Sequence, residues 1–308
     1  MLNNLLFYLG LFAAVYGISL PQALTQQLYF VPTHHLAEPV NVGLLPRPIL
    51  RTMPEKVDDD IGPVVQAQSA LVMDQASGAV LWQKEPDTVL PIASITKLMT
   101  AVVAEDLITN WDETYTLQWS EVALGGVIFS AGVGDTFTKR DLLKSALVGS
   151  VNSAAAALAH STNLSETNFV VAMNAKADQL GLTQTQYVEP TGLNANNIST
   201  ASDLAVLLRT ISAHPLLLEP LTQVEHRMMT GDREMIVKTT NRLVKNGDPY
   251  VYAGKTGFTY EAGNCLVALA KDADGNQIII VVLGAPDETS RFEATAELAQ
   301  WAFDHYRW

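Results

Sequence analysis

The stretch PIASITKLMTA, residues 91–101, places a serine and a lysine one helical turn apart at the head of an apolar run. Residues 95–109 are rich in apolar side chains and predict a largely buried helix. Burying the Lys97 ammonium is costly, and the usual response is a lowered pKa. A neutral Lys97 beside Ser94 would be a base beside a nucleophile, so this stretch predicts the Ser-Lys form of covalent catalysis.

The S-x-x-K spacing is weak evidence when it stands alone, because a chain of this size should contain it about once by chance. The plain alternative is an N-terminal serine cap followed by a lysine whose ammonium reaches solvent. The choice between these interpretations therefore depends on what else the sequence offers to the same site.

Two further segments favour the catalytic interpretation. VGSVNSAAAALAH, residues 148–160, places Ser150 and Asn152 in a polar gap before an alanine-rich helix, and capping alone explains only one of them well. AGKTGFTYEAGN, residues 253–264, begins on a predicted strand with a lysine, a threonine and a glycine. The glycine would let a ligand approach the backbone, and its two neighbours would offer charge and a hydroxyl to an anion.

The GKT tripeptide does not form a phosphate-binding loop. That motif requires a glycine five residues before Gly254, and the chain has Pro249 there.

The histidines are scattered singly and no Cys/His spacing fits zinc, so we expect no metal and no cofactor. The net charge of −13 and the lack of a basic stripe argue against nucleic acid as a partner.

The order of predicted elements indicates one α/β (α+β) domain over residues 64–308. Strands are expected at 69–74, 79–84, 250–258, 264–272 and 277–285, and helices at 95–109, 139–160, 168–182, 200–212 and 290–308. The simplest architecture is an antiparallel sheet, built from both ends of the domain and flanked by helices, with a helical lobe inserted between the two halves.

The first 63 residues differ in composition from the rest. Residues 5–20 are apolar and uncharged, which suits a secretion signal or an N-terminal membrane anchor over residues 1–23. Residues 24–63 contain repeated prolines and the acidic run 58–60, and predict a linker or arm. We therefore expect export to the periplasm or to the outer face of the cell membrane, with or without cleavage of the leader.

The motifs S-x-x-K, S-x-N and K-T-G, in this order, resemble those of penicillin-recognising serine enzymes. Over about residues 65–308 the chain resembles the low-molecular-mass penicillin-binding proteins, which are serine D-alanyl-D-alanine carboxypeptidases and related endopeptidases. The segments that carry the resemblance include YVEPTGLN, NRLV and VVLGAPDETSRF as well as the three motifs. The resemblance implies a β-lactamase/transpeptidase-like fold, peptidoglycan stem peptides as substrates, and β-lactam antibiotics as covalent inhibitors.

The resemblance also implies a role for each matching position. Ser94 would attack the carbonyl between two terminal D-alanines, and Lys97 would take its proton. Ser150 would relay a proton to the leaving amine, and Asn152 would bind the substrate amide and hold the lysine. The remaining positions would bind substrate through charge, hydroxyl or backbone groups: Lys255, Thr256, Gly257, Phe258 and Arg291. The backbone N–H groups of Ser94 and Phe258 would form the oxyanion hole.

Several functions remain open at this point. Carboxypeptidase is the first expectation because it is the broader class, and an endopeptidase that cuts murein cross-links is the alternative. A class A β-lactamase shares the motifs but needs a glutamate two residues before Leu-Asn, and Glu189 in EPTGLN lies one residue too far. A catalytically silent penicillin-binding sensor is a further alternative, although all three motifs are intact. Arg291 has a plain interpretation too, as a surface arginine in the first turn of a helix.

Overall fold

The computed structural model describes residues 53–124 and 131–308. The expected leader and the expected arm as far as residue 52 lie outside the described residues, so both stay predictions. Residues 51–308 form one compact unit, which contains every element discussed below.

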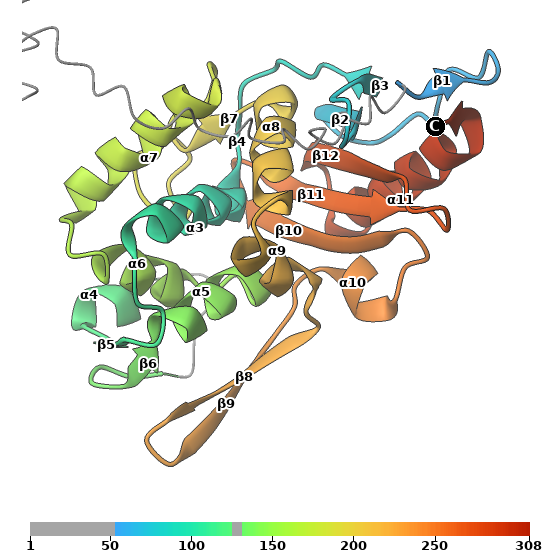
Figure 1. Cartoon of the computed structure of the whole chain (residues 1–308). Helices are drawn as coiled ribbons and strands as arrows, with labels where there is room; N and C mark the ends of the chain where they lie inside the picture. Colours follow the sequence, from blue (N-terminus) through green and yellow to red (C-terminus); the bar gives the residue numbers. More distant parts are fainter. Residues whose placement is uncertain (1–52, 125–130) are drawn as a thin grey trace, which may run out of the picture. The chain divides into compact units, whose positions relative to one another are not determined.

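A five-stranded antiparallel sheet, with strand order β10-β11-β12-β2-β3, is the centre of the fold (Figure 1). Its strands are β2 (Ser69–Asp74), β3 (Val80–Lys84), β10 (Val251–Thr259), β11 (Gly263–Lys271) and β12 (Gln277–Ala285). The pairing of β12 with β2 joins the two ends of the domain. The expected sheet, made from both ends of the chain, is therefore confirmed.

The sheet is covered on both faces, which explains why its central strands β11 and β12 are apolar in most positions. In β11, Val267 and Leu269 belong to the core shared with the helical lobe, whereas Leu266 and Ala268 belong to a second core. Helix α11 (Glu288–His305) covers the second face, and α8 (Ala201–Ser212) lies over the first (Figure 1). Because β10 is at one end of the strand order, one edge of its backbone faces away from β11.

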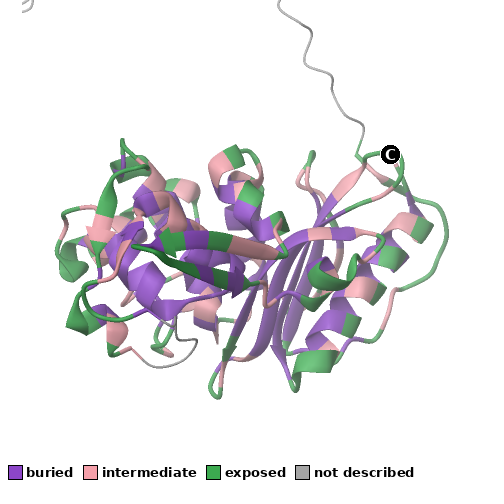
Figure 2. Ribbon diagram, turned by 90° about the horizontal axis from the view of Figure 1, so that it is seen from below, coloured by how far each residue is buried: buried purple, intermediate pink, exposed green. Residues whose placement is uncertain are grey.

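The inserted lobe is helical, as expected from the sequence. Its main helices are α3 (Thr96–Leu107), α5 (Lys139–Val148), α6 (Asn152–His160) and α7 (Glu166–Leu180). Residues 154–157 of α6 are all alanine and all buried, so neighbouring helices can approach its backbone closely. Figure 2 shows this buried interior on the helical side and along the strands of the sheet.

Shorter elements complete the described chain. They are β1 (Glu55–Lys56), β4 (Leu90–Pro91), the 3₁₀ helix η1 (Ala93–Ile95), β5 (Thr114–Thr116), α4 (Trp119–Val122), β6 (Thr136–Thr138), β7 (Ile198–Ser199), α9 (Pro215–Thr222), β8 (Glu225–Thr230), β9 (Arg233–Lys238), α10 (Arg242–Asn246) and β13 (Tyr306–Arg307). The β8–β9 hairpin projects from the domain (Figure 1) and was not anticipated.

The end of the chain differs from the expectation. A helix was expected to run to residue 308, but α11 ends at His305 and β13 pairs with β1. Further contacts join the same two regions: Trp301 Nε1 donates to Asp60 Oδ1 at 2.7 Å, and His305 Nδ1 lies 2.6 Å from Asp58 Oδ2. The described end of the expected arm thus lies against the terminal helix, a pairing that local periodicity cannot reveal.

Within the described residues, no single helix combines the length and hydropathy of a membrane span. Helices α8 and α9 meet those criteria only as a pair, and the pair is bent by 106°.

Candidate active site

Ser94 lies in η1, immediately before α3, and Lys97 lies in the first turn of α3. The one-turn spacing brings the two side chains together, with Lys97 Nζ 2.7 Å from Ser94 Oγ. Ala93, just before the serine, has a φ of +47°, an uncommon conformation for a residue with a Cβ. The expected pairing of nucleophile and base is therefore present in the geometry.

Lys97 is only 1% exposed, and its ammonium nitrogen has three oxygen neighbours. It donates to Ser94 Oγ, to Asn152 Oδ1 at 2.7 Å, and to the carbonyl of Thr191. Burial lowers the pKa of Lys97 from 10.5 to about 7, and the charge of Glu189 opposes this shift. A substantial fraction of Lys97 is then neutral near pH 7, as a general base requires.

Ser150 and Asn152 come from the break between α5 and α6, where the sequence shows its polar gap. Ser150 has a φ of +58°, again uncommon for a residue with a Cβ. This turn directs the two side chains to different partners. Asn152 accepts from Lys97, whereas Ser150 Oγ accepts from Lys255 Nζ at 2.7 Å.

The K-T-G segment lies in β10, and its lysine is the one that donates to Ser150. Lys255 is 1% exposed, and burial, followed by the charges of Lys97 and Arg291, lowers its pKa well below 10.5. The Oγ atoms of Thr256 and Thr240 are 2.5 Å apart. A Cβ on Gly257 would lie 2.8 Å from the carbonyl oxygen of Ile92, so a side chain there would push β10 away from η1.

Arg291, in the first turn of α11, is 5% exposed and points toward the β10 edge. It donates to the carbonyl of Gly257 at 3.0 Å and to Glu288 at 3.2 Å. Burial lowers its pKa, and the nearby Arg242 adds to the shift. The plain interpretation of Arg291 as a surface residue is therefore wrong.

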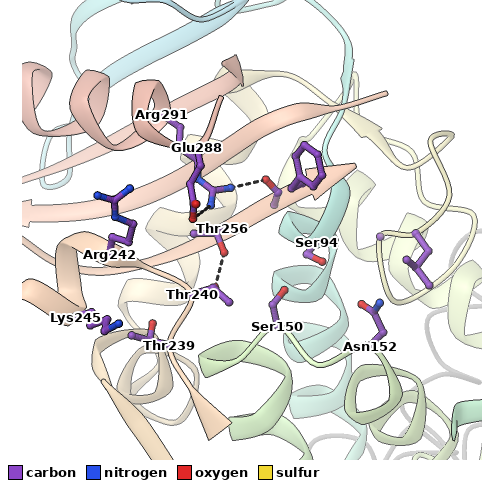
Figure 3. Close-up of a pocket in the computed structure, with 14 residues that line it drawn as sticks. Ser94, Ser150, Asn152, Thr239, Thr240, Arg242, Lys245, Thr256, Glu288 and Arg291 are labelled. Atoms are coloured by element: carbon purple, nitrogen blue, oxygen red, sulfur yellow. Dashed lines mark hydrogen bonds and ion pairs between the residues drawn. The ribbon is translucent and has the colours of Figure 1, made fainter. Parts of the chain in front are cut away.

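One pocket, with a volume of about 510 Å³, brings these groups together (Figure 3). Its lining includes seven of the nine positions expected from the sequence: Ser94, Ser150, Asn152, Thr256, Gly257, Phe258 and Arg291. Lys97 and Lys255 lie directly behind the pocket, where they donate hydrogen bonds to Ser94 and Ser150, respectively. Phe258 is 53% exposed, and its ring contacts that of Tyr260 edge to face.

The sequence interpretation missed several lining and supporting residues. Thr239, Thr240, Arg242 and Lys245 line the pocket from the segment before β10, and Gly192 lines it from the loop after Glu189. The NRLV segment was a signal for part of this set, but its spacing alone assigns no role.

Glu189 shapes the loop that contacts Lys97. Its carboxylate accepts hydrogen bonds from the backbone N–H and hydroxyl of Thr191, both at 2.6 Å, from the N–H of Gly192 at 2.6 Å, and from the side chain of Asn197 at 2.8 Å. A carboxylate saturated in this way supports a turn and does not hold a catalytic water. The β-lactamase alternative loses its candidate base.

Comparison with known proteins gives one consistent result. A family model described as D-alanyl-D-alanine carboxypeptidase, peptidase S11, matches residues 56–287. The D-alanyl-D-alanine endopeptidase of Pseudomonas aeruginosa is 42% identical over 76% of this chain and 76% of its own, and that of Escherichia coli is 35% identical over 78% of each.

The fold comparison agrees with the sequence comparison. The crystal structure of a D-alanyl-D-alanine carboxypeptidase from Mycobacterium tuberculosis matches 81% of this chain and 96% of its own, with a TM-score of 0.75 and 27% identity. The expected β-lactamase/transpeptidase-like fold is thereby confirmed. From these matches we conclude that the chain belongs to the D-alanyl-D-alanine carboxypeptidase family of serine-type peptidases.

Proposed function

We propose that the protein hydrolyses the bond between the two terminal D-alanines of peptidoglycan stem peptides through an acyl-enzyme on Ser94. Neutral Lys97 takes the proton of Ser94 as its Oγ attacks the carbonyl carbon. The backbone N–H groups of Ser94 and Phe258 stabilise the oxyanion that forms. The single observation that carries the proposal is the 2.7 Å contact between a buried lysine with a pKa of about 7 and a serine that opens into the pocket.

Loss of the amine then completes acylation. Ser150 relays the proton that Lys97 has taken to the departing amine as the C–N bond breaks, which leaves neutral Lys97 and an ester on Ser94. Lys97 then deprotonates a water molecule that attacks this ester, and Ser94 recovers its proton as the peptide acid leaves. Ser150 is suited to the relay because its hydroxyl accepts a hydrogen bond from Lys255 and because the residue lines the pocket together with Ser94.

The leaving D-alanine carries one carboxylate, and the β10 side of the pocket can receive it. The hydroxyl of Thr256 and the guanidinium of Arg291 line this side, with Lys255 behind them. Asn152 is placed to bind the substrate amide while its side-chain oxygen accepts from Lys97. Gly257 allows the peptide backbone to approach β10.

Cutting of murein cross-links is the second candidate function. The endopeptidase names of the 42% and 35% identical relatives favour it. Both activities use the same acyl-enzyme and differ only in the amine that leaves.

For either reaction we infer peptidoglycan peptides as substrates and β-lactams as covalent inhibitors. We also infer export to the periplasm or to the outer face of the cell membrane, with residues 1–23 as leader or anchor.

The test is to incubate the full chain with a free pentapeptide and with a cross-linked dimer, and to analyse both by mass spectrometry. Trimming releases D-alanine from the pentapeptide, and cutting converts the dimer to monomers. A penicillin adduct mapped to the peptide that contains Ser94 supports the nucleophile. An enzyme that forms this adduct but turns over neither peptide would be a penicillin-binding sensor, and rapid penicillin turnover would make it a β-lactamase.

A further inference from the structure

The pocket continues beyond the groups that the reaction requires. Figure 3 shows Ser94 on one side of the Thr240–Thr256 pair, and Arg242, Lys245 and Thr239 on the other. In the proposed reaction, the terminal carboxylate of the leaving group lies at Thr256. The space lined by Arg242 and Lys245 is therefore the continuation of the leaving side of the cleft.

The two cations at this end have no anionic partner among the described residues. Arg242 and Lys245 are both exposed, and neither forms an ion pair with any carboxylate in the part of the chain that the structure describes. The 14 residues of the pocket lining include three basic side chains and one acidic side chain, Glu288, which is paired with Arg291. In a chain with a net charge of −13, this local excess of positive charge points to an anionic ligand.

Both cations lie on α10, a short helix that is capped at both ends. Asn241 caps α10 by accepting from the N–H of Leu243 at 3.1 Å, and Gly247 ends the helix in the left-handed conformation. The guanidinium of Arg242 lies over the ring of Phe292, 5.6 Å from its centroid. The helix and this contact orient Arg242 beside the pocket, so less ordering is needed when it binds a ligand.

We propose that Arg242 and Lys245 form a second carboxylate-binding subsite on the leaving side, which selects cross-linked stem peptides. A free D-alanine has a single carboxylate, which Thr256 and Arg291 already accommodate. A leaving group that is itself a peptide extends farther and carries additional carboxylates, and these reach the second subsite. The inference rests on the proposed function and identifies the cross-linked dimer as the substrate that uses the full length of the cleft.

The test measures binding, so that it does not depend on turnover. Calorimetry compares the full-length Ser94→Ala variant with the same protein carrying Arg242→Gln and Lys245→Gln, using a cross-linked dimer and a free pentapeptide. Losing two charge-assisted contacts should weaken dimer binding about ten- to hundredfold and leave pentapeptide binding within about twofold. Lys271→Gln, which removes an exposed charge outside the pocket lining, is the matched control and should change neither.

If the two glutamine substitutions weakened the binding of both peptides equally, the proposed subsite would be contradicted. Unchanged binding of the dimer would contradict it as well. Arg242→Lys with Lys245→Arg should keep most of the preference for the dimer, and the preference should decrease as salt is raised. Turnover by the unmodified enzyme is measured separately. If it cleaves neither peptide, the proposed function fails while the binding contrast still decides the subsite.

Discussion

The two sides of the cleft each bury one lysine, and the two lysines differ in what surrounds them. On the helical side, Lys97 contacts the hydroxyl of Ser94, the side chain of Asn152 and a carbonyl, with the charge of Glu189 nearby. On the sheet side, Lys255 contacts Ser150 and its neighbour's carbonyl, with two cations nearby. Both are 1% exposed, so burial alone does not distinguish them.

The difference lies in the sign of the neighbouring charges. Burial lowers both pKa values, but Glu189 limits the shift at Lys97 and leaves its pKa at about 7, whereas Lys97 and Arg291 deepen the shift at Lys255. A pKa near neutrality suits a group that must accept and return a proton. A lysine among cations gains most from a bound anion, which supports our proposal that the sheet side binds the carboxylate.

The largest expected effect follows from removing the nucleophile on the helical side. Ser94→Ala should lower kcat by about 10⁴-fold or more and abolish covalent labelling by fluorescent penicillin, because no hydroxyl remains to be acylated. Labelling on a gel and D-alanine release measure the two losses. Ser153→Ala is the matched control, since this buried hydroxyl has no hydrogen-bond partner among the described residues. Retained labelling of Ser94→Ala would show that the nucleophile is elsewhere.

The next effect separates chemistry from stability at Lys97. Lys97→Met should lower kcat by about 10³- to 10⁴-fold, because the general base is lost. The same variant should be more stable than the parent. In the folded parent, the pKa of Lys97 is about 7, below its ordinary value of 10.5. Between these two pH values Lys97 is protonated in the unfolded chain and neutral in the folded protein. The free energy of unfolding of the parent therefore rises with pH across this window.

The stability advantage of Lys97→Met should therefore be full below about pH 7 and shrink toward pH 10.5, by up to about 1.4 kcal/mol per pH unit. Urea titrations at several pH values measure it. Lys139→Met is the control, as this lysine is also buried but is paired with Glu113 away from the cleft. A constant difference between parent and Lys97→Met across the window would contradict the lowered pKa.

A smaller effect is expected on the sheet side. Arg291→Gln should raise KM for a substrate with a free terminal carboxylate by about ten- to hundredfold and change kcat little. An analogue whose terminal carboxylate is replaced by an amide should be cleaved poorly by the parent and be nearly insensitive to the substitution. A loss that is equal for both substrates would mean that Arg291 supports β10, through Gly257, and does not bind the carboxylate.

The smallest effect is expected at Glu288, where a substitution should lower KM and not raise it. It is the acidic residue of the pocket lining, it is exposed, and it is paired with Arg291. Glu288→Gln should lower KM for anionic peptides by about two- to threefold at low salt, and the gain should disappear at high salt. Steady-state kinetics at two ionic strengths measure this change. A rise in KM would show that Glu288 is needed to orient Arg291.

Much of the sheet and most of the site could be predicted from the sequence, because both follow from local patterns. Continuous apolar runs predicted the central strands, and the spacing of Ser94 and Lys97 predicted their contact. The β8–β9 hairpin was missed although Gly231 and Asp232 separate two alternating segments, which is a recognisable turn signal. The β1–β13 pairing could not be predicted, because it joins residues about 250 positions apart.

The roles of Glu189, Thr240 and Arg242 could not be predicted for a similar reason. Each is an ordinary polar residue in its own segment and acquires its role through a group from another element: the Lys97 ammonium for Glu189, the Thr256 hydroxyl for Thr240, and the ring of Phe292 for Arg242. The motifs identified the groups that we propose to react. The residues that shape the cleft around them become visible only in three dimensions.

The most direct test of the central claim is the rate of Ser94 acylation by penicillin as a function of pH. If neutral Lys97 removes the serine proton, the rate falls by about tenfold per pH unit below an apparent pKa near 7, because the protonated lysine cannot act as a base. A rate that stays constant down to about pH 5 would contradict the lysine as the base, whatever its distance from the serine.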